Sequence, residues 1–317
     1  MINLESAKKC LISISPTAYM QMRRLYQATP YRRRLIEKDE RNAKIERELV
    51  DEHLRVRLAH EAKIIKEYLN NDWTVRHGPF AGMRYAPITS SSLLSPKVIG
   101  SYESPIYQWI TEAIAHNYQK ILNIGYGEGY YAVGFALKSE ATHVYAYDSN
   151  ERARKKVATI AKLNGITDNL HIQGQCTMDE LQREVTSGTL ILCDIEGGEL
   201  DLFRPDLVPR LSEADLIIET HDSWRPGVTE TLTDRFLPSH GIEIIYHCAK
   251  TAKAFPVLGT IPIKEHAFLL EEGRPRNQRW MRLLANLPEA IDPQPGQWWL
   301  PPGEIDPPIP RVLCNER

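Results

Sequence analysis

The sequence predicts an α/β protein with a mostly parallel, doubly wound sheet of seven strands, in which one late strand runs antiparallel. From Tyr107 onward, short apolar runs alternate with helical patterns, which is typical of a parallel sheet covered by helices on both faces. A length of 317 residues and a hydrophobic content of 42% suffice for at least one complete core. The 39 Lys and Arg residues nearly balance 41 Asp and Glu residues, so no global positive field would attract nucleic-acid phosphates.

Residues 1–100 predict a helical arm followed by a short β segment. The stretch from Ile36 to Leu69 contains neither Gly nor Pro and spaces apolar residues among charged ones, as an amphipathic helix does. Asn70 to Asp72 should end this helix. Trp73 to Pro87, with Gly and Pro at its turns, predicts a hairpin-like segment. The helix is expected to pack against its own domain or against a second copy, as one route to a homodimer.

Residues 101–276 predict the sheet domain. The predicted strands are Lys120–Ile124, His143–Tyr147, Leu170–Gln173, Thr189–Cys193, Ala214–Ile218, Ile242–His247 and His266–Leu270. The predicted helices are Ile106–His116, Tyr130–Leu137, Glu151–Asn164, Met178–Val185, Leu200–Leu207 and Val228–Leu237. A stretch with Pro and Gly but no clear helical period separates the last two strands. These strands are therefore expected to form a late hairpin that includes the antiparallel strand.

Residues 277–317 predict an extended, Pro-rich C-terminal strap. Repeated prolines from Pro288 onward exclude a helix or a central strand. Trp298 and Trp299 would be costly to leave in water, so the strap is expected to lie on the domain or on a second subunit. Together with the N-terminal arm, it is where specificity for the acceptor is expected to reside.

The sequence also indicates the cellular compartment in which we expect the protein. It has no run of 18 apolar residues, and its start lacks the charged and apolar regions of a signal peptide. The 5 cysteines are scattered and never form a C-x-x-C pair, which argues against a disulfide framework or a thiolate zinc site. We therefore expect a cytoplasmic protein without a membrane partner.

A glycine-rich turn follows the first predicted strand and opens a helix. Residues 121–131 read Ile-Leu-Asn-Ile-Gly-Tyr-Gly-Glu-Gly-Tyr-Tyr, which brings backbone N–H groups to the positive end of a helix. The dinucleotide fingerprint needs a glycine at the place held by Tyr130, which counts against a nicotinamide or flavin cofactor. The next strand ends at Asp148, whose carboxylate can accept hydrogen bonds from both ribose hydroxyls. An adenosine-containing ligand is therefore predicted.

These residues resemble class I S-adenosylmethionine-dependent methyltransferases, and specifically the FkbM-like family. The motifs that carry the resemblance are Asn123–Tyr131, Ala146–Asp148 and Cys193–Glu199, and it spans about Val98 to Arg276. It implies a Rossmann-like fold with an antiparallel seventh strand, and S-adenosylmethionine (SAM) as cofactor. The cofactor contacts that it implies are Tyr102, Glu103, Gly125, Tyr126, Gly127, Glu128, Asp148, Ser149, Cys176, Thr177 and Asp194. The resemblance further implies that Gly125, Gly127 and Glu128 surround the methionine portion and that Asp148 holds the ribose. The residues after the third strand, Gln175, Cys176 and Thr177, would border the adenine.

Polar residues follow the fourth and fifth predicted strands, where ligands of open parallel sheets bind. They are Asp194, Glu196 and Glu199 after strand four, and Glu219, His221, Asp222 and Trp224 after strand five. Glu199 is expected to cap the next helix, and the catalytic candidates are Asp194, Glu196 and His221.

Methyl transfer requires alignment of donor and acceptor and removal of a proton from the acceptor. Two routes for this proton are open. In one, His221 or Glu196 is the base. In the other, Asp194, Glu219 and His221 hold a divalent cation (Mg²⁺, Mn²⁺ or Fe²⁺) that lowers the pKa of the acceptor hydroxyl.

The sequence therefore predicts a SAM-dependent methyltransferase that acts on a small molecule. As the family resemblance implies, the acceptor is expected to be an oxygen of a sugar or of a natural-product scaffold. No nucleic-acid partner is expected. Two alternatives stay open: a non-catalytic methyltransferase-like assembly domain, and a dinucleotide-binding enzyme. Glu128, Asp148 and Asp194 occur together, which argues against a scaffold because a scaffold needs none of them.

Overall fold

A computed structural model describes residues 52, 54–89, 93–275 and 277–285 of the chain. The chain divides into two compact units, residues 1–59 and 60–317. In the first unit, residues 52 and 54–59 are helical; in the second, residues 60–68 are helical, within the stretch where an amphipathic helix is predicted. The rest of the predicted arm, and the Pro-rich strap with Trp298 and Trp299, lie outside the described residues. Within the described part, none of the helices is both long and apolar enough to cross a membrane.

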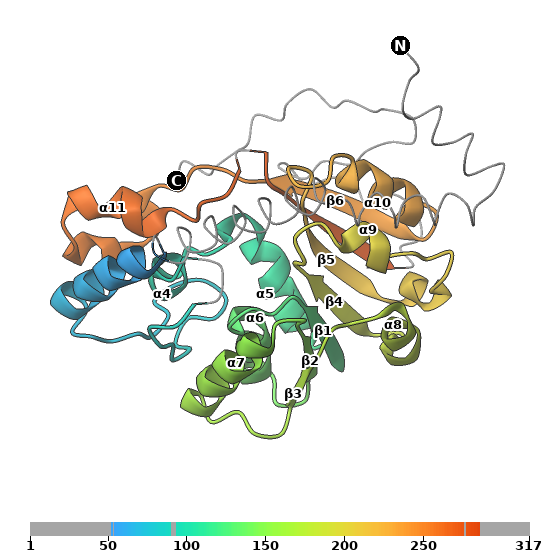
Figure 1. Ribbon diagram of the computed structural model, residues 1–317, viewed down its shortest axis with the longest axis horizontal. Helices are drawn as coiled ribbons and strands as arrows, with labels where there is room; N and C mark the ends of the chain where they lie inside the picture. The colour runs from blue at the N-terminus through green and yellow to red at the C-terminus, as the bar shows by residue number, and fades with distance from the viewer. Residues whose placement is uncertain (1–51, 53, 90–92, 276, 286–317) are drawn as a thin grey trace, which may run out of the picture. The chain divides into compact units, whose positions relative to one another are not determined.

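The second unit contains one sheet of seven strands, in the order β3-β2-β1-β4-β5-β7-β6 (Figure 1). The strands are β1 (Lys120–Ile124), β2 (His143–Tyr147), β3 (Leu170–Gln173), β4 (Thr189–Cys193), β5 (Asp215–Thr220), β6 (His240–Tyr246) and β7 (Arg279–Ala285). Strands β1 to β5 pair in parallel, whereas β7 lies antiparallel between β5 and β6. The predicted α/β, Rossmann-like sheet with an antiparallel last strand is therefore confirmed.

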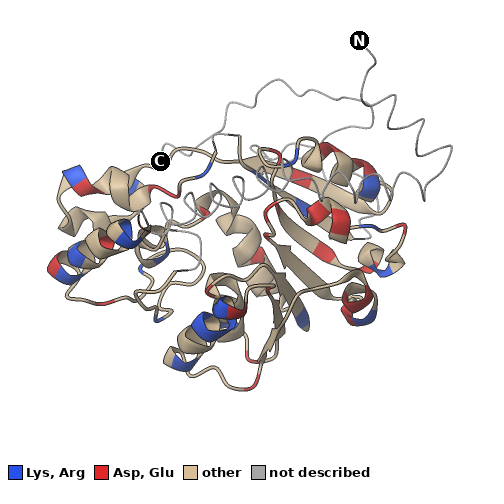
Figure 2. Cartoon of the chain, in the orientation of Figure 1, with Lys and Arg blue, Asp and Glu red and all other residues tan. Residues whose placement is uncertain are grey.

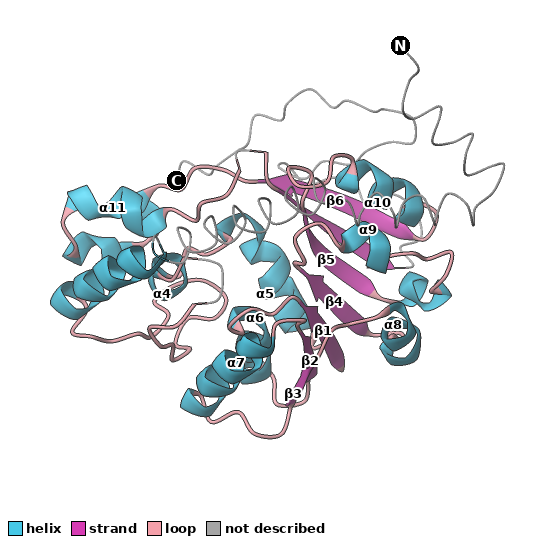
Figure 3. Ribbon diagram, in the orientation of Figure 1, coloured by secondary structure: helices cyan, strands magenta, loops and turns pink. Residues whose placement is uncertain are grey.

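Helices cover both faces of this sheet. Figure 1 shows α5 (Tyr107–His116), α6 (Tyr130–Lys138) and α7 (Glu151–Leu163) on one side, and α8 (Met178–Glu184), α9 (Glu199–Leu202) and α10 (Val228–Phe236) on the other. Short 3₁₀ turns cover Ser104–Ile106, Pro209–Glu213, Ala252–Ala254 and Pro256–Thr260. Helices α4 (Ser95–Ile99) and α11 (Ile263–Leu270) pack against each other beside the sheet (Figure 3).

The pattern of buried residues explains why β4 forms a strand and α7 forms a helix. Strand β4 is buried along its whole length, as its continuous apolar run requires in a sheet covered on both faces. Helix α7 buries Ala153, Val157, Ile160 and Ala161, which recur at helical spacing, while its Lys and Arg residues face outward.

Two predicted elements are wrong. The segment His266–Leu270, predicted as the last strand, belongs to helix α11, and the antiparallel strand is Arg279–Ala285, within the range expected to form the C-terminal extension. A run as short as Ala-Phe-Leu-Leu cannot by itself distinguish a helix from a strand. The helix predicted at Leu200–Leu207 has only the 4 residues of α9, because Pro205 disfavours helical geometry at the residue before it. The hairpin-like segment contains one antiparallel bridge, Thr74 with Arg84.

The turn between β1 and α6 lies against the end of β4. Gly125 and Gly127 have φ angles of 80° and 56°, a region that glycine adopts without strain. A Cβ atom on Gly125 would lie 1.7 Å from the carbonyl oxygen of Asp194. The backbone N–H of Asp194 in turn donates to the carbonyl oxygen of Ile124 at 3.0 Å. Glycine is therefore required at 125 by the packing of the chain on itself, and not only by the approach of a ligand.

Gly125→Ala should destabilise the protein far more than Gly165→Ala. Both glycines have a positive φ, which costs a substituted residue about 1–2 kcal/mol, but a Cβ on Gly165 meets no atom within 4 Å. The clash with Asp194 should add about 1–3 kcal/mol to the loss in the free energy of unfolding. Urea denaturation of both variants measures the difference. Equal losses would show that the turn relaxes to accept the methyl group.

Candidate cofactor and catalytic site

A cavity of about 730 Å³ lies at the carboxyl ends of the parallel strands. Its walls come from the β1–α6 turn, the end of β2, the loop after β3, the turn after β4 and the end of β5. Its volume is in the range of pockets that enclose small ligands. Every residue predicted to contact the cofactor, from Tyr102 and Glu103 through Asp148 to Asp194, lines this cavity. Residues from segments far apart in the sequence therefore meet at one place, as the predicted sheet requires.

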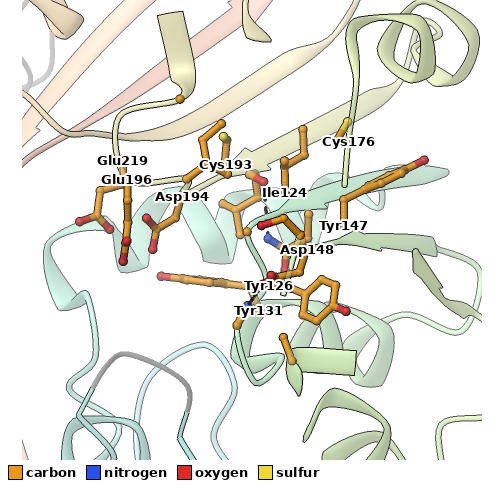
Figure 4. A pocket seen from close by; sticks show the side chains of 18 of the residues that line it. Ile124, Tyr126, Tyr131, Tyr147, Asp148, Cys176, Cys193, Asp194, Glu196 and Glu219 are labelled. Atoms are coloured by element: carbon orange, nitrogen blue, oxygen red, sulfur yellow. Dashed lines mark hydrogen bonds between the residues drawn. The ribbon is translucent and has the colours of Figure 1, made fainter. Parts of the chain in front are cut away.

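Asp148 is held at the middle of the cavity by backbone hydrogen bonds (Figure 4). Its Oδ2 accepts from the N–H of Gly127 at 3.0 Å, and its Oδ1 accepts from the N–H of Asn150 at 2.7 Å. A carboxylate oxygen can accept two hydrogen bonds, so each oxygen has capacity for one further donor. The contact with Gly127 also fixes the end of β2 to the glycine turn.

One end of the cavity is mainly apolar and is bordered by Tyr147 and Cys176 (Figure 4). Burial raises the pKa of the Cys176 thiol to about 12, so this side chain stays neutral. Thr177 forms a capping box at the start of α8, in which its hydroxyl accepts from the N–H of Glu180. Thr177 therefore contributes to the wall of the cavity while its hydroxyl stabilises the helix.

The opposite end gathers the carboxylates of Asp194, Glu196 and Glu219 (Figure 4). The Asp194 side chain is 42% exposed, whereas that of Glu219 is buried. The Asp194 carboxylate faces the recessed cavity near Glu103 and not open solvent, which raises its pKa to about 6. Burial, together with Asp194 and Glu103, raises the pKa of Glu219 to about 8. Glu196 is exposed at the rim with a φ of 52°.

His221 lies behind this cluster and is not part of the cavity wall. Its side chain is 7% exposed. Its Nδ1 donates to Glu199 Oε1 at 2.7 Å, and its Nε2 is 3.4 Å from Asp194 Oδ1 and 3.7 Å from Glu219 Oε1. Burial alone would lower the pKa of His221, but the hydrogen bond to Glu199 and the adjacent carboxylates outweigh it and raise the pKa to about 9.

Glu199 has a second role beside the expected one. It is the first residue of α9, and its Oε1 accepts from the backbone N–H of Gly197 at 3.2 Å, as a residue that stabilises a helix start does. The same oxygen faces His221. Glu199 therefore orients the His221 ring, which the sequence pattern did not indicate.

Arg274 was missed by the sequence analysis. Its guanidinium forms ion pairs with Glu103 and Glu219, and its Nε donates to Glu272 at 2.9 Å. Its charge also lies 5.3 Å from the centre of the Tyr102 ring, a distance typical of a cation–π contact. No motif or spacing identifies this residue. The only signal is the surplus of predicted carboxylates, which requires cations to pair with them.

Lys97 is the second missed cation. It forms a buried ion pair with Glu128, to which the Tyr85 hydroxyl also donates at 3.1 Å. Its Nζ lies 4.8 Å from the centre of the Tyr102 ring. Burial lowers the pKa of Lys97 to about 7. Glu128, which the family resemblance places at the methionine portion of the cofactor, is thus already bound by two side chains.

Glu199→Gln should lower the pKa of His221 from about 9 toward the ordinary histidine value of about 6.5, because the variant loses the charged acceptor at Nδ1. An NMR titration of the ring protons measures this. The signal of His240, whose ring contacts Ala214 and Ser239, should not move. The raised pKa in the folded state means that this interaction stabilises the protein below about pH 6.5 and stops doing so as the pH rises through about 9. An unchanged His221 pKa in the variant would contradict this assignment.

No family model matches the chain, and neither does any curated protein. Among solved structures it is similar to the O-methyltransferase TomG from Streptomyces achromogenes, which is involved in tomaymycin synthesis, in complex with SAM (9% identity, 73% of this chain and 90% of that chain, TM-score 0.40). It is also similar to an O-methyltransferase from Bacillus cereus in complex with SAH (12%, 55% and 77%, TM-score 0.38). A third similar structure is an rRNA methylase from Streptococcus thermophilus (13%, 57% and 96%, TM-score 0.37). At TM-scores below 0.5 these similarities carry no weight for function.

Proposed function

We propose that the protein is a SAM-dependent methyltransferase. The observation that carries this proposal is one cavity with Asp148 at its middle and the carboxylates of Asp194, Glu196 and Glu219 at one end. The hydroxyls of a ribose need a carboxylate acceptor such as Asp148. A positively charged sulfonium is stabilised by carboxylates such as those at the acidic end of the cavity. The resemblance to class I methyltransferases of the FkbM-like kind, with their antiparallel seventh strand, supports the same conclusion.

In one orientation of SAM within the cavity, each of its chemical groups lies beside residues that suit it. The adenine lies between Tyr147 and Cys176, the ribose hydroxyls donate to Asp148, and the methionine portion follows the β1–α6 turn toward Glu128. The sulfonium methyl points to Asp194. This orientation places the flat apolar group at the apolar end of the cavity and the cationic group at the acidic end.

The proton of the acceptor goes to Asp194 in this arrangement. The acceptor oxygen forms a bond to the methyl carbon, the carbon–sulfur bond breaks with its electron pair going to sulfur, and Asp194 accepts the hydroxyl proton. His221 is not part of the cavity wall, so it positions Asp194 instead of acting as the base itself. Glu196, exposed at the same rim, is the alternative base.

The second route uses a divalent cation. Asp194, Glu219 and His221 each offer a ligand atom within 4.8 Å of the others, and two carboxylates with an imidazole suit Mg²⁺, Mn²⁺ or Fe²⁺. When bound, such a cation would lower the pKa of the acceptor hydroxyl. One feature favours the metal-free route: Arg274 is already paired with Glu219, so a cation would have to displace the guanidinium.

We propose a neutral polyhydroxyl acceptor, such as a sugar or a glycosylated natural product. The rim carries Glu196 and an Asp201 that is paired with Arg225, and Asp and Glu residues are prominent on α8, α9 and α10, whereas Lys and Arg concentrate on α7 (Figure 2). A phosphate group would be repelled there, which disfavours nucleic acids. Trp224, 68% exposed in the loop after β5, lies beside Gly197 and offers an apolar face for a sugar ring.

Isothermal titration calorimetry should show saturable binding of S-adenosylhomocysteine (SAH) and none of NAD. Asp148→Asn should weaken SAH binding about 10- to 100-fold, because it removes a charged acceptor from the ribose hydroxyls. Asp168→Asn, on an exposed loop residue, serves as the matched control and should not change the affinity. Binding of NAD instead of SAH would support the dinucleotide alternative, and binding of neither would support the non-catalytic one.

Mn²⁺ added to the SAH-saturated protein should show no saturable binding at this cluster, because the Arg274 guanidinium already occupies Glu219 and a cation would have to displace it. Calorimetry or the electron paramagnetic resonance signal of Mn²⁺ measures this. The Asp194→Asn variant is the control, because it removes one candidate ligand and any Mn²⁺ that it still binds must be bound elsewhere on the protein. Tight binding that this variant abolishes would establish the cation route instead.

A further inference from the structure

The amino-acid portion of SAM carries a carboxylate, and the proposed site is rich in carboxylates. We propose that Lys97 binds this carboxylate and so anchors the methionine portion of the donor. Lys97 is the one Lys or Arg side chain among the described residues that line the cavity. The assignment rests on the proposed function and adds a donor-binding residue that neither the sequence motif nor the family resemblance indicates.

The position of Lys97 fits this role. It lies in α4, ahead of the sheet domain, and its side chain is 3% exposed. Its ion pair with Glu128 holds Nζ at the β1–α6 turn, where the methionine portion is proposed to lie. Its contact with the face of Tyr102 holds it from the other side. The cation is therefore fixed before the donor arrives, so little side-chain entropy is lost on binding.

Electrostatics requires a cation at this place. Glu103, Glu128, Asp194 and Glu219 line the same cavity, and an unpaired donor carboxylate among them would be repelled at low dielectric. Arg274 is another nearby cation, but it is engaged by Glu103, Glu219 and Glu272 and does not line the cavity. Lys97 and Glu128 together present a positive and a negative charge, which match the carboxylate and the ammonium of the donor.

The burial of Lys97 favours the binding of a second anion beside it, in addition to Glu128. Removal from water lowers its pKa to about 7, although the nearby carboxylates of Glu103 and Asp194 act to raise it. A bound carboxylate would stabilise the charged form. Charge-assisted hydrogen bonds of this kind are among the strongest polar contacts in proteins.

The test compares SAH with its decarboxylated analogue S-adenosyl-3-thiopropylamine, which lacks only the carboxylate. The wild-type protein should bind SAH about 10- to 100-fold more tightly than the analogue. In the double variant Lys97→Met with Glu128→Gln, this preference should fall to about 3-fold or less. The paired substitution is used because removing Lys97 alone would leave a buried, uncompensated Glu128 carboxylate. Lys97→Arg should retain most of the preference.

A matched ion pair away from the cavity serves as the control. Lys120 and Glu184 are 3.1 Å apart near the start of β1, and Lys120→Met with Glu184→Gln should leave the preference for SAH unchanged. A wild-type preference that persists in the Lys97 double variant would overturn the assignment while leaving the proposed function intact. Failure of the wild-type protein to bind either ligand would instead remove the proposed function.

A crystal structure of the wild-type protein with SAH decides the question without any variant. The Nζ atom of Lys97 should lie within about 3.2 Å of a carboxylate oxygen of SAH. A carboxylate bound only by backbone N–H groups of the β1–α6 turn, with Lys97 turned away, would overturn the assignment. This measurement applies equally if the double variant does not fold.

Discussion

The close approach of the β1–α6 turn to the backbone at the end of β4 determines the geometry of the whole site. The Asp194 carbonyl oxygen occupies the space that a side chain at Gly125 would fill, so the two strand ends meet without a side chain between them. This contact places the Asp194 carboxylate beside the turn. The hydrogen bond from Gly127 to Asp148 brings in the end of β2 in the same way. The glycines of the turn therefore let the strand ends approach closely enough for these side chains to line one cavity.

The buried charges form the second constraint. Taking carboxylates such as Glu103 and Glu219 out of water is costly unless cations pair with them. Arg274 provides this compensation for both, and it joins the segment that precedes α5 to the end of β5. A hydrophobic cluster of the same volume would be as stable or more stable. A dense charged group at the edge of a sheet is therefore better explained by ligand binding than by folding.

The sequence predicted the central parallel strands because they are short apolar runs, of which β4 is buried along its whole length. Strand β7 was missed because it contains Arg279 and Arg282. Arg282 is buried in the sheet through paired contacts with Glu243 on β6 at 2.8–2.9 Å, a partner that only the tertiary structure reveals. The residues of the site divide in the same way, into those that the sequence predicts and those that only the tertiary structure reveals. Residues directly after strands were predicted to meet, whereas packing between segments distant in sequence brings Lys97 to the cavity wall and Arg274 to the carboxylates of Glu103 and Glu219.

His221 shows why residue type alone does not assign a catalytic role. An isolated histidine has a pKa that suits a base at neutral pH. Here its two nitrogens face Glu199 and Asp194, so the ring is protonated and sits behind the residue that meets the cavity. A protonated ring stabilises the Asp194 carboxylate while that group is charged, and this limits how far burial raises the pKa of Asp194. In the function proposed above, the histidine therefore sets the basicity of its neighbour, and Asp194 accepts the proton near neutral pH.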